Sequence, residues 1–387
     1  MRTITLLLMT ILAAAAAEAG QSAQAAQKQP AAEAGAVSSS RLALPIKRMW
    51  QHLTDEATTI RPTLDGSRIY LPLAGGRLFC LDRDTGALVW SAEPGGIISS
   101  PVVASETALY VATRRVSADG SDSGASLRAL DKTTGLTLWE RDYERPFTSA
   151  ITLSGERIYA GSADGSLYSM DSKDGRVVWK VATQSMVRGR ALITEQALYF
   201  GSDDGGLRIV EPERGQLLYK YQTGGAVRGR PAIDDTAIYF GSGDGHVYSL
   251  DLKSFKLRWR SRTGAAIEAS PVIVDDRLLV ASFDNFIYAL SRSNGDRVWK
   301  RRLENRIAAD PVVDGDASMI APLRGDYVAV FLNSDGRRVN IYQLEREYEI
   351  VAEPVFSGDL LLLSTNKGLV VTAVTHAGTR RENAVKK

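Results

Sequence analysis

The chain has 387 residues and a nearly balanced charge, with 47 Lys and Arg against 45 Asp and Glu and a net charge of +2. This balance argues against general nucleic-acid binding, which requires a dominant basic face. The single cysteine, Cys80, excludes an intramolecular disulfide. Because Cys80 alternates with apolar residues in a strand-like stretch, we expect a buried and inert thiol.

The N-terminus predicts export. Residues 1–19 have the pattern of a cleaved signal peptide, with an early positive charge at Arg2, an apolar run over 4–17 and small residues at 17–19. Residues 23–25 offer a second cleavage site. The apolar run is too short to span a membrane, and no cysteine follows it to carry a lipid. We therefore expect a periplasmic or secreted protein without a transmembrane span.

Most of the remaining chain consists of sequence repeats. Residues 20–40 are mostly Ala, Gln and Ser, which predicts a disordered tether. Beyond it, a closing aromatic recurs with an unbroken spacing of forty, at Trp139, Trp179, Tyr219, Trp259 and Trp299. Each unit also contains alternating apolar stretches joined by turns such as Asp244-Gly245, a hairpin signal. Four short strands in a unit of about forty residues indicate a β-propeller blade.

The number of blades follows from the inner strands. Eight inner-strand starts can be recognised, at Arg61-Pro62, Ser100-Pro101, Ser149-Ala150, Arg190-Ala191, Arg230-Pro231, Ser270-Pro271, Asp310-Pro311 and Glu353-Pro354. The eighth blade lacks a closing aromatic, whereas residues 44–53 carry Trp50 without a preceding repeat. We predict an all-β, eight-bladed β-propeller of four-stranded blades over residues 41–378, with the ring closed by this N-terminal strand in the last blade. Residues 379–387 would form a tail, and the 117–124 part of an insertion at 116–126 in the second blade a mobile loop.

Residues present in nearly every blade are expected to maintain the fold. The closing aromatics belong to this class, because a large ring can clamp one blade to the next while an indole N–H reaches a carbonyl. They are Trp50, Trp90, Trp139, Trp179, Tyr219, Trp259 and Trp299. Aspartate also recurs at one hairpin position, in Asp164, Asp204, Asp244 and Asp284. Each lies in its own hairpin, whereas calcium needs about six converging oxygens, so no metal site is expected.

Catalytic patterns are not evident. The three histidines, His52, His246 and His376, occupy unrelated repeat positions. No Gly-x-Ser-x-Gly elbow, His-Glu-x-x-His pair or phosphate-binding loop occurs in the chain. The sequence therefore predicts no catalytic residue, and a role as an enzyme is the less favoured interpretation.

Two positions vary between blades. One is the residue at the start of each inner strand, and the other lies two residues before it. Because inner strands line the central channel, we expect these side chains to ring one of its mouths. The charged members, which we take as candidate binding residues, are Arg61, Arg188, Arg190, Arg228, Arg230, Glu268, Asp310 and Glu353. Blades two and three contribute Ser99, Ser100 and Ser149 instead.

This ring allows two interpretations. Arginine on one arc and carboxylate on the next could simply neutralise each other across a wet channel. Alternatively, the four arginines of blades four and five, in the repeated phrase Val-Arg-Gly-Arg, could hold a carboxylate, a phosphate or an acidic peptide. The sequence leaves both possibilities open.

The motif Leu-x-x-Leu-Asp-x-x-Thr-Gly-x-x-x-Trp at residues 78–90 resembles the pyrroloquinoline-quinone (PQQ)-type propeller repeats. The resemblance extends over nearly the whole chain and is specific for architecture rather than function. It is closer to the BamB family, non-catalytic subunits of the outer-membrane β-barrel assembly machinery, than to the quinoprotein dehydrogenases. Those enzymes carry a vicinal cysteine pair, which this chain lacks, and BamB proteins carry a lipidation cysteine, which it also lacks.

The BamB resemblance implies a non-catalytic periplasmic scaffold, without a cofactor, that binds protein or peptide partners of the cell envelope. We expect a monomer that binds no nucleic acid. The alternative is a small PQQ-dependent or other quinoprotein dehydrogenase with its substrate in the central channel. A third possibility is passive anion binding by Arg190 and Arg230.

Overall fold

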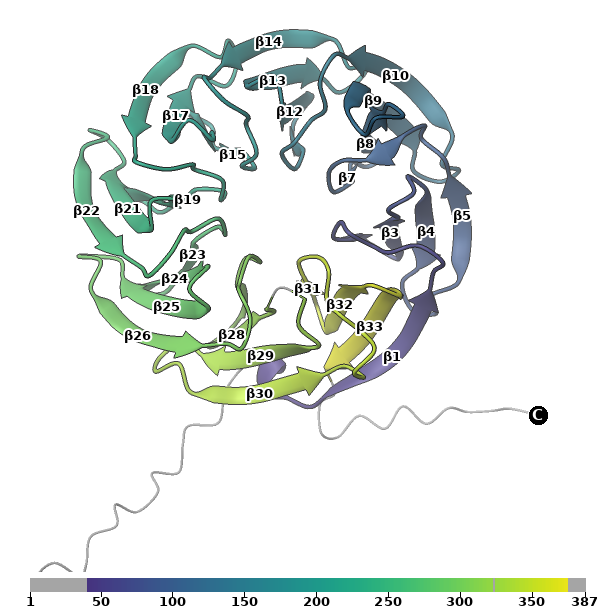
Figure 1. Cartoon of the computed structure of the whole chain (residues 1–387). Coiled ribbons are helices and arrows are strands. Elements are labelled where there is room, and N and C mark those ends of the chain that lie inside the picture. Colours follow the sequence, from purple (N-terminus) through teal and green to yellow (C-terminus); the bar gives the residue numbers. More distant parts are fainter. Residues whose placement is uncertain (1–39, 323, 375–387) are drawn as a thin grey trace, which may run out of the picture. The chain divides into compact units, whose positions relative to one another are not determined.

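The structure, a computed structural model, describes residues 40–322 and 324–374. These residues form eight antiparallel sheets arranged as blades in a ring (Figure 1). The helical content of this part of the chain is one 3-10 turn, η1, at Arg41–Ala43. The predicted all-β, eight-bladed propeller is confirmed. The expected signal peptide (1–19), all but the last residue of the expected tether (20–40) and the expected tail (379–387) lie outside the described residues.

Seven blades follow the chain from their innermost to their outermost strand. The strands of the first four blades are β2 (Thr63–Asp65), β3 (Arg68–Pro72), β4 (Leu78–Asp82), β5 (Leu88–Ala92); β6 (Ile97–Ile98), β7 (Val103–Ala104), β8 (Ala108–Val116), β9 (Asp122–Asp131), β10 (Thr137–Tyr143); β11 (Thr152–Ser154), β12 (Arg157–Gly161), β13 (Ser166–Asp171), β14 (Val177–Ala182); and β15 (Leu192–Ile193), β16 (Leu198–Gly201), β17 (Gly206–Val210), β18 (Leu217–Gln222).

The last four blades follow the same order except at the closure. Their strands are β19 (Ala232–Ile233), β20 (Ala237–Gly241), β21 (His246–Asp251), β22 (Leu257–Arg262); β23 (Val272–Val274), β24 (Arg277–Ser282), β25 (Phe286–Ser291), β26 (Arg297–Arg302); β27 (Val312–Asp314), β28 (Ala317–Ile320), β29 (Tyr327–Leu332), β30 (Arg338–Gln343); and β31 (Val355–Ser357), β32 (Leu360–Thr365), β33 (Gly368–Val374), β1 (Ile46–Leu53).

The ring closes through the N-terminal strand. Strand β1 pairs antiparallel with β33, from Ile46 opposite Val374 to Leu53 opposite Gly368. The eighth blade therefore has the order β1-β33-β32-β31, with β1 outermost (Figure 1). The two ends of the described chain are thus hydrogen-bonded to each other, which leaves neither the first nor the last blade without a neighbour.

The residues just before β1 dock on the seventh blade, a contact that sequence reasoning did not predict. Leu42 is fully buried between blades seven and eight. The amide of Asn340 donates hydrogen bonds to the carbonyls of Leu42 and Leu44, at 2.9 and 2.7 Å. Arg41 forms an ion pair of 2.5 Å with Asp314. The closing segment consequently attaches to two blades rather than one.

The insertion in the second blade is mostly strand. Strands β8 and β9 run on to Val116 and from Asp122, so residues 117–121 alone form the connection. Arg114 pairs with Asp122 at 3.1 Å across this hairpin. The sequence-based prediction of a loop over the 117–124 part of this insertion was therefore wrong for residues 122–124, which belong to β9. The second blade is also the one five-stranded sheet in the described part of the chain, because β6 and β7 both pair with β8.

The core lies between blades rather than within them. The buried apolar side chains form eight clusters, and each cluster joins two neighbouring blades. Between blades four and five, for example, Tyr199 and Ile209 pack with Phe240 and Leu250. Each blade is therefore stabilised by burial against its two neighbours, as in other repeat architectures.

The closing aromatics connect each blade to a turn of the next. The indole N–H of Trp179 donates to the carbonyl of Pro212 at 3.0 Å, and its ring covers Gly215. A Cβ at Gly215 would lie 2.6 Å from the ring, and this residue has a φ of +68°, so glycine is required on both grounds. Equivalent indole-to-carbonyl bonds are made by Trp50, Trp139, Trp259 and Trp299.

One blade interface replaces both members of this contact. The fourth blade ends in Tyr219 instead of Trp, and the facing turn of the fifth blade has Phe255 where the other turns have glycine. The two rings pack against each other with centroids 5.2 Å apart and planes inclined by 31°. Phe255 keeps the left-handed backbone of the glycine it replaces, with a φ of +57°. The larger turn residue thus fills the space that the smaller aromatic leaves.

This pair predicts strong coupling in a double-mutant cycle. Tyr219→Trp alone should destabilise the protein by about 1–3 kcal/mol, because the larger ring collides with Phe255. Phe255→Gly alone should cost about 2–4 kcal/mol, since it opens a cavity while relieving backbone strain. The double variant restores the arrangement of the other blades and should lose less than the sum of the two, measured by chemical denaturation. Strictly additive losses would contradict the interpretation.

Each recurring aspartate stabilises the hairpin in which it lies. Asp164, Asp244 and Asp284 each accept a hydrogen bond from a tyrosine hydroxyl four residues later, at 2.5, 2.7 and 2.5 Å. In the fourth blade Arg208 replaces the tyrosine and binds Asp204 with two hydrogen bonds, at 3.1 and 2.5 Å. Burial opposes ionisation of Asp204, but the guanidinium and two backbone N–H groups hold its pKa well below the usual range.

We expect this buried ion pair to depend on both partners. The side chains of Arg208 and Asp204 are only 6% and 5% exposed. Arg208→Ala should therefore destabilise the protein by about 3–5 kcal/mol, because it leaves a buried carboxylate without its cation. Arg208→Tyr restores the residue of the other blades and serves as the matched control, with an expected loss below about 1.5 kcal/mol. Equal losses in the two variants, measured by chemical denaturation at neutral pH, would count against this role.

Candidate functional site

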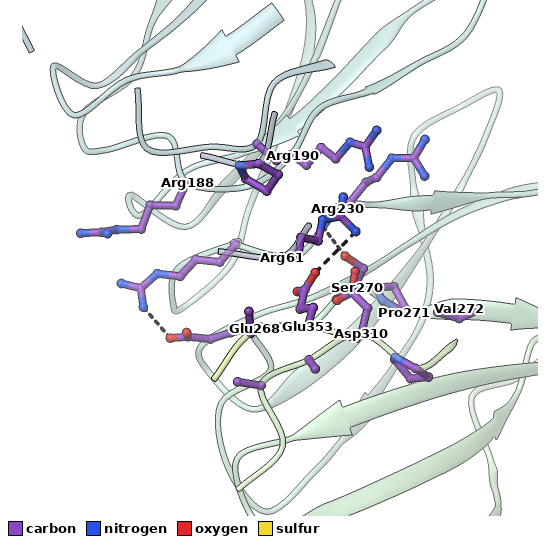
Figure 2. A pocket seen from close by; sticks show the side chains of 18 of the residues that line it. Arg61, Arg188, Arg190, Arg230, Glu268, Ser270, Pro271, Val272, Asp310 and Glu353 are labelled. Carbon is purple, nitrogen blue, oxygen red and sulfur yellow. Dashed lines mark hydrogen bonds and ion pairs between the residues drawn. The ribbon is translucent and has the colours of Figure 1, made fainter. Parts of the chain in front are cut away.

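The candidate binding residues line one cavity at the centre of the ring. The cavity has a volume of about 860 Å³ and receives residues from all eight blades. All eight charged residues singled out in the sequence line it, and Figure 2 labels all of them except Arg228. Ser99 and Ser100 also lie in the wall. Ser149 does not; its buried hydroxyl accepts a hydrogen bond from the amide of Gly161 at 2.7 Å within the third blade.

These side chains reach the cavity because of the segments that enter the inner strands. In Val-Arg-Gly-Arg, the glycine lets neighbouring segments approach closely, since a Cβ at Gly229 would lie 2.5 Å from the carbonyl oxygen of Ala269. Consecutive segments are also hydrogen-bonded to each other. The amide of Arg230 donates to the Ser270 hydroxyl at 2.9 Å, and the amide of Ser270 donates to Asp310 at 2.6 Å. Residues forty apart are thereby held side by side around the cavity.

One group of charges forms a fully paired row, which we call the outer row: Arg188, Asp203, Arg228 and Glu268. Asp203 binds Arg188 at 2.9 Å and Arg228 at 2.7 Å, and Arg228 continues to Glu268 at 2.5 Å. Figure 2 shows the last of these contacts beside the labelled Glu268. Arg188 at the end of the row is 44% exposed, whereas Asp203 is 13% exposed. The outer row therefore exposes the charge of Arg188 to solvent, while the largely buried Asp203 holds that side chain in place.

Asp203 is the site residue that sequence reasoning missed. It directly precedes the recurring Asp204 in the hairpin of the fourth blade, where the other blades carry Ala163, Gly243 and Phe283. The position thus varies between blades, which is the same signal that identified the arginines. It was overlooked because it lies in a hairpin rather than at the start of an inner strand.

A second group, which we call the inner cluster, contains Arg61, Arg190, Arg230, Asp310 and Glu353. Arg61 and Glu353 approach to 3.7 Å, longer than a hydrogen bond. Asp310 and Glu353 lie beside each other in Figure 2 and influence each other's charge. The inner cluster brings together three guanidiniums and two carboxyl groups from five blades.

The pKa values in the inner cluster are shifted toward the neutral forms. Burial, with the nearby positive charges of Arg61 and Arg230, lowers the pKa of Arg190 to about 10. Burial and the neighbouring Asp310 raise the pKa of Glu353 to about 7, against the opposing pull of Arg61 and Arg190. Burial likewise raises the pKa of Asp310, although the Ser270 amide opposes this shift. Strongly perturbed groups facing a cavity are typical of functional sites.

Comparison with known proteins identifies the family. The family model described as outer membrane protein assembly factor BamB matches residues 46–142, 116–229 and 222–386. The chain belongs to this family. None of the curated proteins matches it.

Solved structures agree on the fold. BamB from Moraxella catarrhalis is 18% identical, with a TM-score of 0.72, over 85% of this chain and 97% of that one. The computationally designed Ika8 protein is 15% identical, with a TM-score of 0.72, over 84% and 99%. A europium-containing methanol dehydrogenase is 12% identical, with a TM-score of 0.70, over 85% and 93%. At these identities, the likenesses show a shared propeller only.

A metal-dependent quinoprotein would need side chains that can hold a metal ion beside the cavity. Among the described residues, no group of three His, Cys, Asp or Glu side chains could hold a metal ion. The two carboxyl groups of the inner cluster face three guanidiniums, which disfavours a bound cation. Cys80 is buried in the first blade, where burial raises its pKa to about 11. These residues do not fit a metal-assisted dehydrogenase site.

His52 contacts the Gly86 carbonyl at 3.1 Å and His246 lies beside Asp244, so the two histidines are not brought together. His376 lies outside the described residues. In the part of the chain that the structure describes, no helix is both long and apolar enough to cross a membrane.

The raised pKa of Glu353 predicts how stability changes with pH. The folded protein holds the Glu353 proton more tightly than the unfolded chain does, so this group makes the folded state less stable as pH rises from about 4.5 to about 7. Glu353→Gln removes the titration and should be more stable than the parent near pH 8, while the two should differ least near pH 5. Thermal denaturation at both pH values tests this. The prediction would be contradicted if the stability difference between the variant and the parent favoured the parent more near pH 8 than near pH 5.

Proposed function

We propose that this chain is a non-catalytic scaffold of the cell envelope that binds a protein or peptide partner in the periplasm and acts in outer-membrane protein assembly. Membership of the BamB family over most of the chain supports this role. The signal-peptide pattern of residues 1–19 supports the location. The observation that carries the proposal is the outer row, which offers exposed charge at the cavity mouth where packing does not require it.

The outer row has the chemistry of a partner surface. The guanidinium of Arg188 uses its Nε for Asp203, and one terminal nitrogen contacts the sulfur of Met186 at 3.1 Å. Both side chains are exposed, with Met186 at 37%. Arginine and methionine are enriched at protein interfaces, since one offers planar hydrogen bonds and the other a deformable apolar contact. An acidic residue of the partner could bind Arg188 while an apolar neighbour covers Met186.

Capture from the native envelope tests the partner surface. The full chain, crosslinked in cells and purified, should recover a defined envelope protein. Arg188→Ala should reduce recovery about tenfold or more, because a charged contact of this kind contributes about 1.5–3 kcal/mol. Arg176→Ala, on an exposed turn of the third blade, is the matched control and should recover the partner like the parent. Equal recovery by all three proteins would remove the outer row from partner binding.

A second candidate function is a PQQ-dependent dehydrogenase that uses the central cavity. The propeller shared with the methanol dehydrogenase favours it, whereas the side chains of the cavity argue against its metal. The purified chain is incubated with PQQ, a divalent or lanthanide ion and an artificial electron acceptor. Turnover of an alcohol or sugar would overturn the scaffold proposal, and absence of turnover would support it.

A further inference from the structure

The two groups of charges around the cavity differ in how completely they are paired. Every member of the outer row has an ion-pair partner within 2.9 Å. In the inner cluster, the contact between Arg61 and Glu353 at 3.7 Å is the one ion pair found among the described residues. Arg190 and Arg230 have none within that part of the chain, although both side chains line the cavity. Mutual neutralisation therefore accounts for the outer row and fails for the inner cluster.

Arg190 is the least satisfied of these groups. Its Nε is buried and has no hydrogen-bond partner among the described residues. Arg230 lies close enough to repel it, and Figure 2 shows both side chains reaching into the cavity. A partly buried guanidinium whose Nε lacks an acceptor is unfavourable, and a second guanidinium close to it adds repulsion. An anion placed between them would relieve both costs.

We propose that the cavity binds a small oxyanion, of the carboxylate, phosphate or sulfate type, between the guanidiniums of Arg190 and Arg230, and that the Asp310–Glu353 pair takes up a proton when it binds. Planar guanidinium forks match the paired oxygens of such groups. This site is separate from the outer row and goes beyond the proposed scaffold function. It requires neither a metal nor a redox step.

The cavity walls restrict the size of the ligand. The floor and sides include Pro231, Pro271, Pro311 and the apolar side chains Ile233 and Ile273. A volume of about 860 Å³ admits a small organic acid with its hydration water. Prolines fix the backbone at the entry of six of the eight inner strands, so the site is already formed in the unbound protein.

Proton uptake follows from the charges that face the carboxyl pair. These are Arg61 from the first blade, Arg190 from the fourth and the two carboxyl groups themselves, and Arg230 from the fifth blade is also near Asp310. With Glu353 titrating near pH 7, the inner cluster is more positive below that pH and less positive above it. An incoming anion raises the carboxyl pKa values further, because like charges disfavour ionisation. Oxyanion binding should consequently be strong below pH 7 and weaken as pH rises through it.

Titration calorimetry on the purified full chain tests the proposal. Sulfate, which stays fully ionised across the range, and succinate are compared with chloride at equal ionic strength, at about pH 6 and about pH 8. We expect sulfate or succinate to bind, up to about tenfold more tightly at the lower pH, which is the limit for uptake of one proton over this range. Preference for succinate would indicate an organic acid as the ligand, and preference for sulfate would indicate a phosphate or sulfate group.

Variants separate this site from general charge attraction. Arg190→Ala and Arg230→Ala should each weaken binding at least about tenfold. Arg190→Lys, which keeps the charge but loses the planar fork, should bind with intermediate affinity. Arg176→Ala should match the parent, and Glu353→Gln should bind with little dependence on pH. Thermal denaturation identifies any variant that fails to fold, in which case the other arginine variant decides.

Three results would overturn the proposal: no binding of either anion by the parent, equal binding of chloride, or unchanged affinity in both folded arginine variants. A pH dependence that persists in Glu353→Gln would overturn the proton uptake. Since the purified chain is measured without any partner, failure here leaves the scaffold proposal intact. Failure to capture an envelope partner likewise leaves the oxyanion site intact.

Discussion

The propeller depends on one contact that is repeated around the ring, between the closing aromatic of a blade and a turn of the next. At Trp179 and Trp259, for example, the indole N–H donates to a carbonyl of the neighbouring blade, and the ring lies where only glycine leaves room. Because the apolar clusters also lie between blades, no blade has a complete core of its own. The contact between Trp50 and the first blade extends the same rule across the chain ends.

This dependence limits what a departure from the repeat means. Phe255 beside Tyr219 and Arg208 beside Asp204 both depart from the pattern, yet each is compensated by a local partner. These two pairs keep the blade structure intact with side chains other than those of the repeat. Arg190 and Arg230 also depart from it and have no ion-pair partner among the described residues. In this molecule, variation between blades does not by itself indicate function. A residue that differs from the repeat and lacks a local partner is the better indicator.

The cavity combines two electrostatic environments within one wall. The outer row is paired, partly exposed and anchored on Asp203, so its charge is available to a partner without being costly to the fold. The inner cluster is partly buried and carries more arginine than carboxylate, and burial raises the pKa of Glu353 to about 7. A rigid ring that presents both could bind a macromolecule at its mouth and a small anion within, with no conformational change required for either.

The sequence by itself determined the architecture. The spacing of forty from Trp139 to Trp299, the eight inner-strand starts and the unmatched Trp50 established eight blades and their closure, because a propeller repeats one local solution that the period makes visible. The same period placed the eight charged residues around the cavity.

The period could not show which of these residues pair, since Arg228 contacts Glu268 and Asp203 through side-chain directions that spacing does not encode. The docking of Leu42 on the seventh blade and the burial that shifts Arg190 and Glu353 likewise arise from contacts between segments far apart in the chain. Only the assembled ring decided these, because desolvation and charge pairing depend on what surrounds a group in space.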